Sequence, residues 1–269
     1  MFDFIPDEKL RELSEQYKDQ YQNQNPFPFI YFDNFFQHDI LNDALAAFPA
    51  LDTMDFYKYD NPLEKKFAFD QLNQLPEPIA KILVYMNSAP ILKFLENLTG
   101  IKHLIPDPYL RGGGIHQIPE GGKLDVHIDF NFHQQLQLYR RVNLIIFLNK
   151  DWEENYGGHL EMWDGYRNEQ GKPVLTEMKA EILPVFDRVA LFSTSEKSYH
   201  GHPRPLACPA DRTRKSIALY YYTATREDEN VDAHSTTFVA TPDEANNKEL
   251  EALREQRNKG RLSTNVSLD

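Results

Sequence analysis

The 269-residue sequence has a single cysteine, Cys208, and no apolar run of the roughly 18 residues that a membrane-spanning helix needs. One cysteine excludes an internal disulfide framework and fits a reducing compartment. Positive charge is also scarce, because 29 Lys and Arg residues stand against 41 Asp and Glu residues. This balance disfavours nucleic-acid binding, which requires a basic surface. The opening residues, MFDFIPDEKLRELSEQ, lack the layout of a signal peptide, so we expect a cytoplasmic protein without a membrane partner.

The hydrophobic pattern changes twice along the chain, within what we predict to be one domain over 1–269. Residues 1–100 are mostly helical in pattern, with one short strand at 29–32 and two helical pieces that break near Pro90 and stop at Gly100. Residues 103–225 read as many short strands separated by Gly, Pro and Asn, which is typical of a sandwich, barrel or jelly roll. Residues 226–269 are polar, with a helix-start signature at Thr241-Pro242-Asp243-Glu244 and a loosely held tail. The pattern predicts a mainly β fold with flanking helices.

The segment VHIDFN, at 126–131, places His127 and Asp129 one residue apart in a predicted strand. Residues i and i+2 of a strand project from the same face, so both side chains point at one spot. An isolated H-x-D pair is more often the polar face of a half-buried strand. A third ligand is offered by His200, because a jelly roll brings distant strands side by side. Two imidazoles and one carboxylate then make the facial triad of non-haem Fe(II) oxygenases.

Basic residues lie downstream, at the start of the β-prone run DRTRKSIALYYYT, at 211–223. A dicarboxylate co-substrate that chelates the metal at one end needs a cation at the other, and the forked guanidinium of arginine suits a bidentate grip. The order of H-x-D, His and a basic strand start is more specific than any one part. It predicts a metal-dependent oxygenase site and disfavours the alternative of a zinc hydrolase.

Three further motifs, NKDW (149–152), GG (157–158) and PVFDR (184–188), precede His200 and the basic strand. Together they resemble the 2-oxoglutarate, Fe(II)-dependent oxygenases of the prolyl-hydroxylase type, and among these the hypoxia-sensing prolyl hydroxylases. The resemblance covers roughly 110–225. It implies a double-stranded β-helix with iron at its mouth. It also implies that O2 and 2-oxoglutarate are converted to succinate and CO2 while an unactivated C–H bond is hydroxylated, with ascorbate as a further candidate cofactor.

The resemblance also implies roles for individual residues of the metal site. His127, Asp129 and His200 match the iron ligands. His202 is a rival for the last position, since it lies two residues on and has the same strand face. The spacing from Arg188 favours His200.

The co-substrate site is implied in the same way. Arg214 matches the arginine that binds 2-oxoglutarate, and Arg212 and Lys215 are alternatives. Lys215 should point to the opposite face of its strand from Arg214. The chain departs from the family at Phe147 and Ile118, where tyrosines are common beside the co-substrate.

A polar residue on the strand RRVNLIIFLN is a further candidate. Strict alternation puts Arg141, Asn143, Ile145 and Phe147 on one face. We take Asn143 and Phe147 as candidate co-substrate-binding residues. The alternative for Asn143 is a polar group satisfied near a strand end. The glycines of 111–114 either permit close packing or form a flexible lip at the substrate mouth.

The substrate is less defined than the chemistry. The motifs favour proline, peptidyl or free, and an acidic chain suits a basic peptide. One alternative is the same oxygenase chemistry on a non-proline small molecule. Another is a cupin-like module that binds a ligand without turnover. A halogenating relative, in which a small residue replaces the carboxylate ligand, is disfavoured by Asp129. The sequence predicts no oligomeric state.

Overall fold

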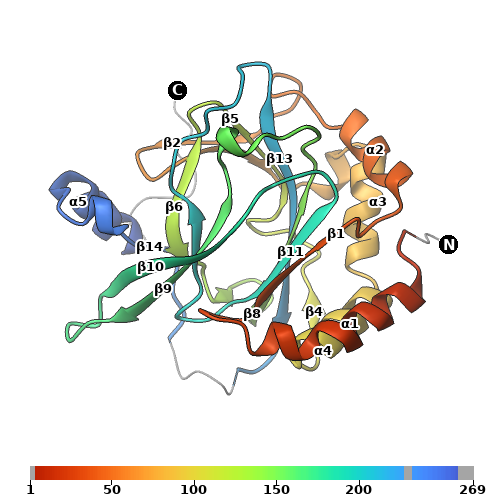
Figure 1. Cartoon of the computed structure of the whole chain (residues 1–269), viewed down its shortest axis with the longest axis horizontal. Helices are drawn as coiled ribbons and strands as arrows, with labels where there is room; N and C mark the ends of the chain where they lie inside the picture. Colours follow the sequence, from red (N-terminus) through yellow and green to blue (C-terminus); the bar gives the residue numbers. More distant parts are fainter. Residues whose placement is uncertain (1–3, 227–231, 260–269) are drawn as a thin grey trace.

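A barrel of antiparallel strands forms the centre of the molecule, with helices α1 to α4 on one side and α5 on the other (Figure 1). The computed structural model describes residues 4–226 and 232–259. Its helices are α1 (Asp7–Gln22), α2 (His38–Ala46), α3 (Glu77–Met86), α4 (Ala89–Thr99) and α5 (Lys248–Asn258), with 3-10 turns at Leu72–Gln74, Glu154–Tyr156 and Pro242–Glu244. None of these helices is long and apolar enough to cross a membrane.

The strands follow one another around the barrel in an order far from that of the sequence. They are β1 (Phe29–Asp33), β2 (Tyr57–Asn61), β3 (Glu64–Phe69), β4 (Ile105–Pro106), β5 (Gly114–Pro119), β6 (Lys123–Ile128), β7 (Phe132–His133), β8 (Leu138–Phe147), β9 (Leu160–Arg167), β10 (Pro173–Ile182), β11 (Arg188–Ser193), β12 (Tyr199–His202), β13 (Thr213–Thr223) and β14 (Thr237–Phe238). The main path runs β1-β11-β8-β13-β5-β3-β6-β12-β9-β10. This is a double-stranded β-helix, as the strand pattern and the resemblance predicted. The order places β6 directly beside β12.

Strand β8 separates the apolar core from the interior of the barrel. Val142, Leu144 and Ile146 belong to the buried cluster that the N-terminal helices cover. The alternate residues Asn143 and Ile145 line a cavity inside the barrel. Burial on both faces explains why the last four residues of this strand, 144–147, are continuously apolar rather than alternating.

The predicted break between two N-terminal helices is confirmed. α3 ends at Met86, and α4 begins at Ala89 with Pro90 in its first turn, where a proline ring is tolerated. Gly100 ends α4 in the left-handed conformation, with φ +76°. Only glycine adopts this conformation without steric cost.

The description of residues 1–100 as helical with a single strand was incomplete. β2 and β3 form a hairpin in this region, and β3 pairs with β5 and β6. The side-chain oxygen of Asn61 accepts hydrogen bonds from the backbone N–H groups of Leu63 (3.0 Å) and Glu64 (3.2 Å), which stabilises the turn. The hairpin is rich in Lys, Asp and Tyr. It therefore lacks the apolar alternation that reveals a strand.

The predicted start of the C-terminal helix was wrong. Thr241 precedes only a 3-10 turn, Pro242–Glu244. α5 begins at Lys248, because the side-chain oxygen of Asn247 accepts a hydrogen bond from the backbone N–H of Leu250 (3.1 Å) and caps the helix there. The predicted loose tail, 261–269, lies outside the described residues.

Candidate active site

Two adjacent strands bring the three predicted ligands together. His127 on β6 lies opposite His200 on β12, and Asp129 follows the end of β6. The Nε2 atom of His127 is 3.5 Å from Oδ1 of Asp129, and Nε2 of His200 is 3.4 Å from Oδ2. One ligand atom from each residue lies within 4.8 Å of the others. His202 does not belong to this group of ligand atoms.

Both imidazoles are oriented by backbone carbonyls. Nδ1 of His127 lies 2.9 Å from the carbonyl oxygen of Asp125, and Nδ1 of His200 lies 2.8 Å from that of Ser198. A carbonyl only accepts, so each Nδ1 carries a proton and each Nε2 faces Asp129. Burial and the neighbouring His127 lower the pKa of His200 to about 4, which keeps this ring neutral. A neutral ring is the form that binds a metal.

The carboxylate of Asp129 is braced by two side chains that come from β8. The Nδ2 atom of Asn143 donates to Oδ2 of Asp129 (2.7 Å), and the guanidinium of Arg140 forms an ion pair with the same oxygen (3.0 Å). The Nε atom of Arg140 donates to Oδ1 of Asn143 (2.8 Å). Burial alone would raise the pKa of Asp129, but Arg140 and His200 hold it well below its usual range. The site therefore presents an ionised ligand. Asn143 is therefore a polar group satisfied by Asp129 and Arg140 inside the barrel, and its role toward the co-substrate stays a prediction.

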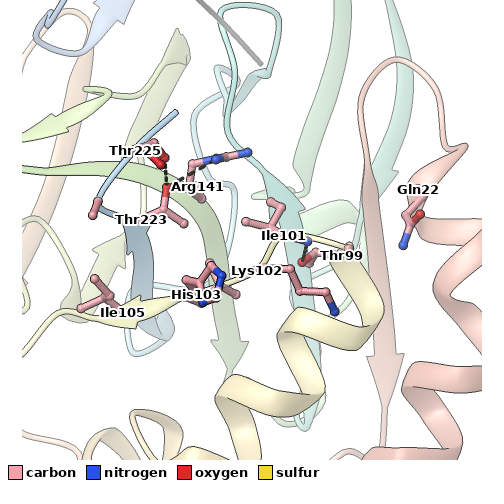
Figure 2. Close-up of a pocket in the computed structure, with 12 residues that line it drawn as sticks. Gln22, Thr99, Ile101, Lys102, His103, Ile105, Arg141, Thr223 and Thr225 are labelled. Carbon is pink, nitrogen blue, oxygen red and sulfur yellow. Dashed lines mark hydrogen bonds between the residues drawn. The ribbon is translucent and has the colours of Figure 1, made fainter. Parts of the chain in front are cut away.

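The position of Arg140 corrects the predicted face of β8. The register of β8 against β13 shifts between Tyr221 and Tyr222, so that Tyr222 pairs with Arg140 and the alternation breaks at Arg141. Arg140 is 1% exposed and lines the barrel cavity with Asn143. Arg141 instead points into a separate hollow of about 890 Å³ beside α4, where its guanidinium donates to the hydroxyl of Thr223 at 3.3 Å (Figure 2).

Arg214 lies in the same cavity as the three ligands, on β13. Its Nε donates to the carbonyl oxygen of Gly158 (2.7 Å), and its guanidinium lies 4.9 Å from the ring centre of Phe147. Among the described residues no carboxylate pairs with it. Burial lowers the pKa of Arg214, and no acidic neighbour offsets this. A buried cation without an anionic partner is costly, so the site favours an anionic ligand at this point.

A glycine makes room for this arginine. A Cβ atom on Gly158 would lie 2.9 Å from Cδ of Arg214 and 2.6 Å from a methyl group of Leu206. Gly158 also has φ +73°, which side-chain-bearing residues rarely adopt. The GG motif thus has a local structural reason here.

The remaining predicted co-substrate residues take other positions. Arg212 donates to the backbone oxygens of Lys150 (3.1 Å) and Asp151 (3.0 Å), and Lys215 donates to Thr213. Neither Arg212 nor Lys215 lines the barrel cavity. Phe147 is fully buried beneath Arg214 and does not line it either, whereas Ile118 does.

The cavity that joins these groups has a volume of about 700 Å³. Its wall includes several aromatic side chains: Tyr57, Tyr59, Phe130, Phe132, Tyr220 and Phe238. Its charged lining consists of three carboxylates and five cations: Glu64, Asp70, Asp129, Lys66, Arg111, Arg140, Arg214 and Arg257. The interior is therefore more basic than the acidic chain as a whole.

Two cavity histidines were not found as site residues from the sequence. His202 is 4% exposed, and neither of its ring nitrogens has a hydrogen-bond partner among the described residues. Burial, followed by Arg214 and Lys66, lowers the pKa of His202 well below its usual range. His116 lines the same cavity, and burial together with Lys66 and Arg214 lowers its pKa to about 3. The only sequence signal for His202 was its spacing from His200, which suggested a rival ligand.

The C-terminal helix reaches the strand that carries His127. The guanidinium of Arg254, on α5, donates to the buried carboxylate of Asp125 (2.8 Å) and also contacts Glu244. The backbone oxygen of Asp125 in turn accepts from His127 (2.9 Å). Phe238 on β14 pairs with His127 and packs on its ring, with 5.7 Å between ring centres. The C-terminal segment therefore supports one wall of the site.

The chemistry of this donor set is specific. Two imidazoles whose Nε2 atoms face one point, together with one ionised carboxylate, fit the facial ligand set of non-haem Fe(II). The unpartnered Arg214 in the same cavity fits the far carboxylate of a dicarboxylate co-substrate. A double-stranded β-helix with both features defines the class of non-haem, 2-oxoglutarate-dependent oxygenases.

Comparison with known proteins gives the same class. Residues 113–222 match the family described as the 2OG-Fe(II) oxygenase superfamily. The barrel of this chain is similar to that superfamily, whose members use Fe(II) and 2-oxoglutarate, and the protein is a dioxygenase.

Solved structures with this fold include prolyl 4-hydroxylases and a non-haem, α-ketoglutarate-dependent epimerase. A Pseudomonas putida prolyl 4-hydroxylase is 18% identical, with a TM-score of 0.50 and coverage of 78% of this chain and 98% of that one. A prolyl 4-hydroxylase from Phytophthora capsici is 18% identical, with a TM-score of 0.52 and coverage of 96% and 79%. SnoN, an α-ketoglutarate-dependent epimerase from nogalamycin biosynthesis, is 11% identical, with a TM-score of 0.54 and coverage of 86% and 87%. The fold is thus shared with the prolyl hydroxylases but does not specify the substrate.

Proposed function

We propose that the protein hydroxylates an unactivated C–H bond, with Fe(II) held by His127, Asp129 and His200 and 2-oxoglutarate held by Arg214. The main support is that a compact set of three ligand atoms and a buried arginine without an anionic partner share one cavity. When bound, Fe(II) and 2-oxoglutarate supply the oxidation, in which one oxygen atom of O2 enters succinate, the other enters the product, and CO2 is released.

The side chains around the ligands have separate tasks in this proposal. The carbonyls of Asp125 and Ser198 hold the Nδ1 protons, so both Nε2 atoms stay available as ligands. Asn143 and Arg140 fix the Asp129 carboxylate and keep it ionised. Preorganised ligands need not rearrange when the metal or substrate binds.

The substrate we propose is proline, peptidyl or free. The motifs shared with prolyl hydroxylases support this choice. The aromatic rings of Tyr59, Phe130 and Tyr220 on the cavity wall offer flat apolar surface to a pyrrolidine ring.

A second candidate is a non-proline small molecule that carries a negative charge. Five cations against three carboxylates line the cavity, and Arg111 has no ion pair among the described residues. Lys66 shares its partner, Glu64, with Arg257. This lining disfavours the basic peptide that the net charge of the chain suggested, and it favours a carboxylate on the substrate, which free proline also has.

The deciding experiment supplies free proline, acidic and basic proline-containing peptides, and small-molecule fractions separately to the Fe(II)-loaded enzyme. Succinate formed from 2-oxoglutarate and the mass of the product are measured together. Stimulation by a proline compound, with a gain of one oxygen, supports the proposal. Stimulation only by a non-proline compound would overturn the proline assignment and leave the oxygenase.

The rival from another class is a cupin-like module that binds without turnover. It predicts binding of 2-oxoglutarate without any succinate, with or without added compounds. If ascorbate takes part, it should increase the number of turnovers before the enzyme loses activity.

We also propose that residues 1–269 act as one domain. The support is that α5 and β14 at one end of the chain contact the strand that carries His127. A single unfolding transition, with coincident signals from the helices and from the metal site, is expected. Two separated transitions would contradict it.

A further inference from the structure

The arginine end of the cavity lacks the aromatic hydroxyl groups that the resemblance led us to expect. Phe147 and Ile118 stand at those positions and bring no polar atom. The Nε of Arg214 is already engaged by the carbonyl of Gly158. A carboxylate has two oxygens and about four acceptor sites, whereas a planar guanidinium donates two parallel N–H bonds to it in a bidentate pair, so acceptor sites remain for another donor.

His202 lies in this same region with unused hydrogen-bonding capacity. It is almost completely buried, and both ring nitrogens lack a partner among the described residues. Buried polar atoms in folded proteins nearly always have partners, so an orphaned imidazole in a cavity indicates a ligand. The neighbours that influence it electrostatically include Arg214 and Lys66, and both are cations. An anionic ligand oxygen is therefore the partner that this environment favours.

The backbone of β12 accounts for the position of this ring. A Cβ atom on Gly201 would lie 2.9 Å from the backbone oxygens of Leu124 and Asp125, so glycine allows β12 to lie close against β6. His200 pairs with His127, and the register then shifts so that His202 pairs with Leu124. The two histidines of the HGH segment thus both line the cavity, but only His200 joins the ligand group.

We infer that His202 donates a hydrogen bond to the distal carboxylate of 2-oxoglutarate, beside Arg214, in place of a tyrosine hydroxyl. This inference rests on the proposed function. The donor is the one N–H that a neutral imidazole always carries, so no change of protonation is required. His202 is a positioning and specificity residue for the co-substrate and not a metal ligand.

The test compares two 2-oxo acids in anaerobic titrations of the Fe(II)-loaded protein, followed by the visible charge-transfer band of the complex. 2-Oxoglutarate has the distal carboxylate, and pyruvate lacks it. His202→Leu should weaken 2-oxoglutarate binding by roughly tenfold, because a hydrogen bond to a charged group is lost. Pyruvate binding should change by less than about twofold. His202→Gln, which keeps an N–H donor, should recover most of the affinity.

Three controls separate the outcomes. Arg214→Met should likewise weaken the binding of 2-oxoglutarate much more than the binding of pyruvate. His133→Leu removes a buried histidine that does not line the cavity and should leave both affinities unchanged. If His202→Leu does not fold, His202→Met, which is unbranched and adapts to the space, takes its place.

An equal loss of affinity for both 2-oxo acids in the His202 variants, or an unchanged affinity for 2-oxoglutarate, would overturn the inference. A charge-transfer band that is missing already from the wild type would instead refute the proposed function. The two failures are thus distinguishable. Loss of Fe(II) binding in His202→Leu, with binding intact in His200→Leu, would mean that His202 is the ligand.

Discussion

The two ends of the barrel cavity differ in how completely the protein satisfies its own polar groups. At the metal end, each imidazole Nδ1 has a carbonyl partner, and Asp129 is held by an amide and a guanidinium. At the arginine end, Arg214 has a single backbone partner and His202 has none among the described residues. At the metal end, the polar groups have protein partners apart from the ligand atoms that face one shared point. At the arginine end, the polar groups need a bound anion as their partner.

This difference separates two ways of building a binding site. The proposed metal ligands are fixed before binding, so metal affinity should depend on groups that never touch the metal. The arginine end keeps unpaired polar groups in the folded protein, at a cost in stability that the ligand relieves. The protein without co-substrate should therefore be less stable than its packing alone suggests, and 2-oxoglutarate should stabilise it.

The largest expected effect is loss of the metal end itself. Alanine at His127, Asp129 or His200 should abolish both turnover and the visible charge-transfer band of the 2-oxoglutarate complex. Each ligand is one of three, and among the described residues no further carboxylate or imidazole joins their group of ligand atoms. Anaerobic absorption spectra and succinate assays check this. A His200→Ala variant that keeps both signals, while His202→Ala loses them, would show that the ligand assignment is wrong.

The next effect concerns the stability of variants at Arg140, which holds Asp129, and at Arg214. Arg140→Met should leave Asp129 as a buried, uncompensated carboxylate and lower the free energy of unfolding by about 3–5 kcal/mol. Arg214→Met should leave stability of the ligand-free protein unchanged or higher, because it removes a buried cation that has no acidic partner. Urea unfolding of both variants without co-substrate provides the comparison. Equal destabilisation by the two substitutions would remove the contrast between the ends.

Arg214, whose replacement should not lower the stability of the ligand-free protein, should matter strongly for binding of the co-substrate. Arg214→Ala should cost about 2–5 kcal/mol of 2-oxoglutarate binding, since the distal carboxylate then lacks its buried cation. Iron affinity should remain nearly intact, because Arg214 contacts none of the three ligands. Titrations with Fe(II) and then with 2-oxoglutarate measure the two steps separately. An unchanged co-substrate affinity would move the role to Arg212.

The smallest expected effect is at the glycine beside Arg214. Gly158→Ala should displace the arginine side chain, because the added methyl group meets Cδ of Arg214. It also forces a left-handed conformation on alanine, which costs about 1–2 kcal/mol of stability. We expect a several-fold weaker 2-oxoglutarate affinity. The matched control is Gly157→Ala, whose added Cβ atom meets nothing within 4 Å although φ is +71°. Because ψ of Gly157 is −150°, in a region essentially restricted to glycine, this variant should lose at least as much stability but none of the affinity.

The sequence predicted the metal end far better than its surroundings. His127 and Asp129 are two residues apart, so the strand period alone aims them together, and His200 needed only the pairing typical of a jelly roll. Arg140 was missed because a bulge, which has no reliable sequence signal, shifts the face of β8. His202 was considered only as a rival ligand, because its lack of partners is a property of burial and cannot be read from spacing.

The fold shows the same division between local and distant causes. Proline and glycine marked the boundaries of α4, since both act through their own backbone geometry. The β2–β3 hairpin was missed because its charged strands are held by contacts with β5 and β6 rather than by their own apolar pattern. Asn247, not Thr241, determines where α5 begins, and both residues have the side-chain oxygen that a helix cap needs.

The bulge in β8 has a consequence for comparing this protein with its relatives. Arg140 and Arg141 are chemically identical neighbours, yet one contacts the carboxylate of the proposed metal site and the other lies in a hollow beside α4. A relative without the extra residue would carry a single arginine here, and an ungapped alignment would match it equally well to either one. Whether the arginine of the relative is aligned with Arg140 or with Arg141 would then depend on where the gap is placed and not on residue identity. Substitution patterns at Arg140 are informative about the site only after the strand register has been established for each relative.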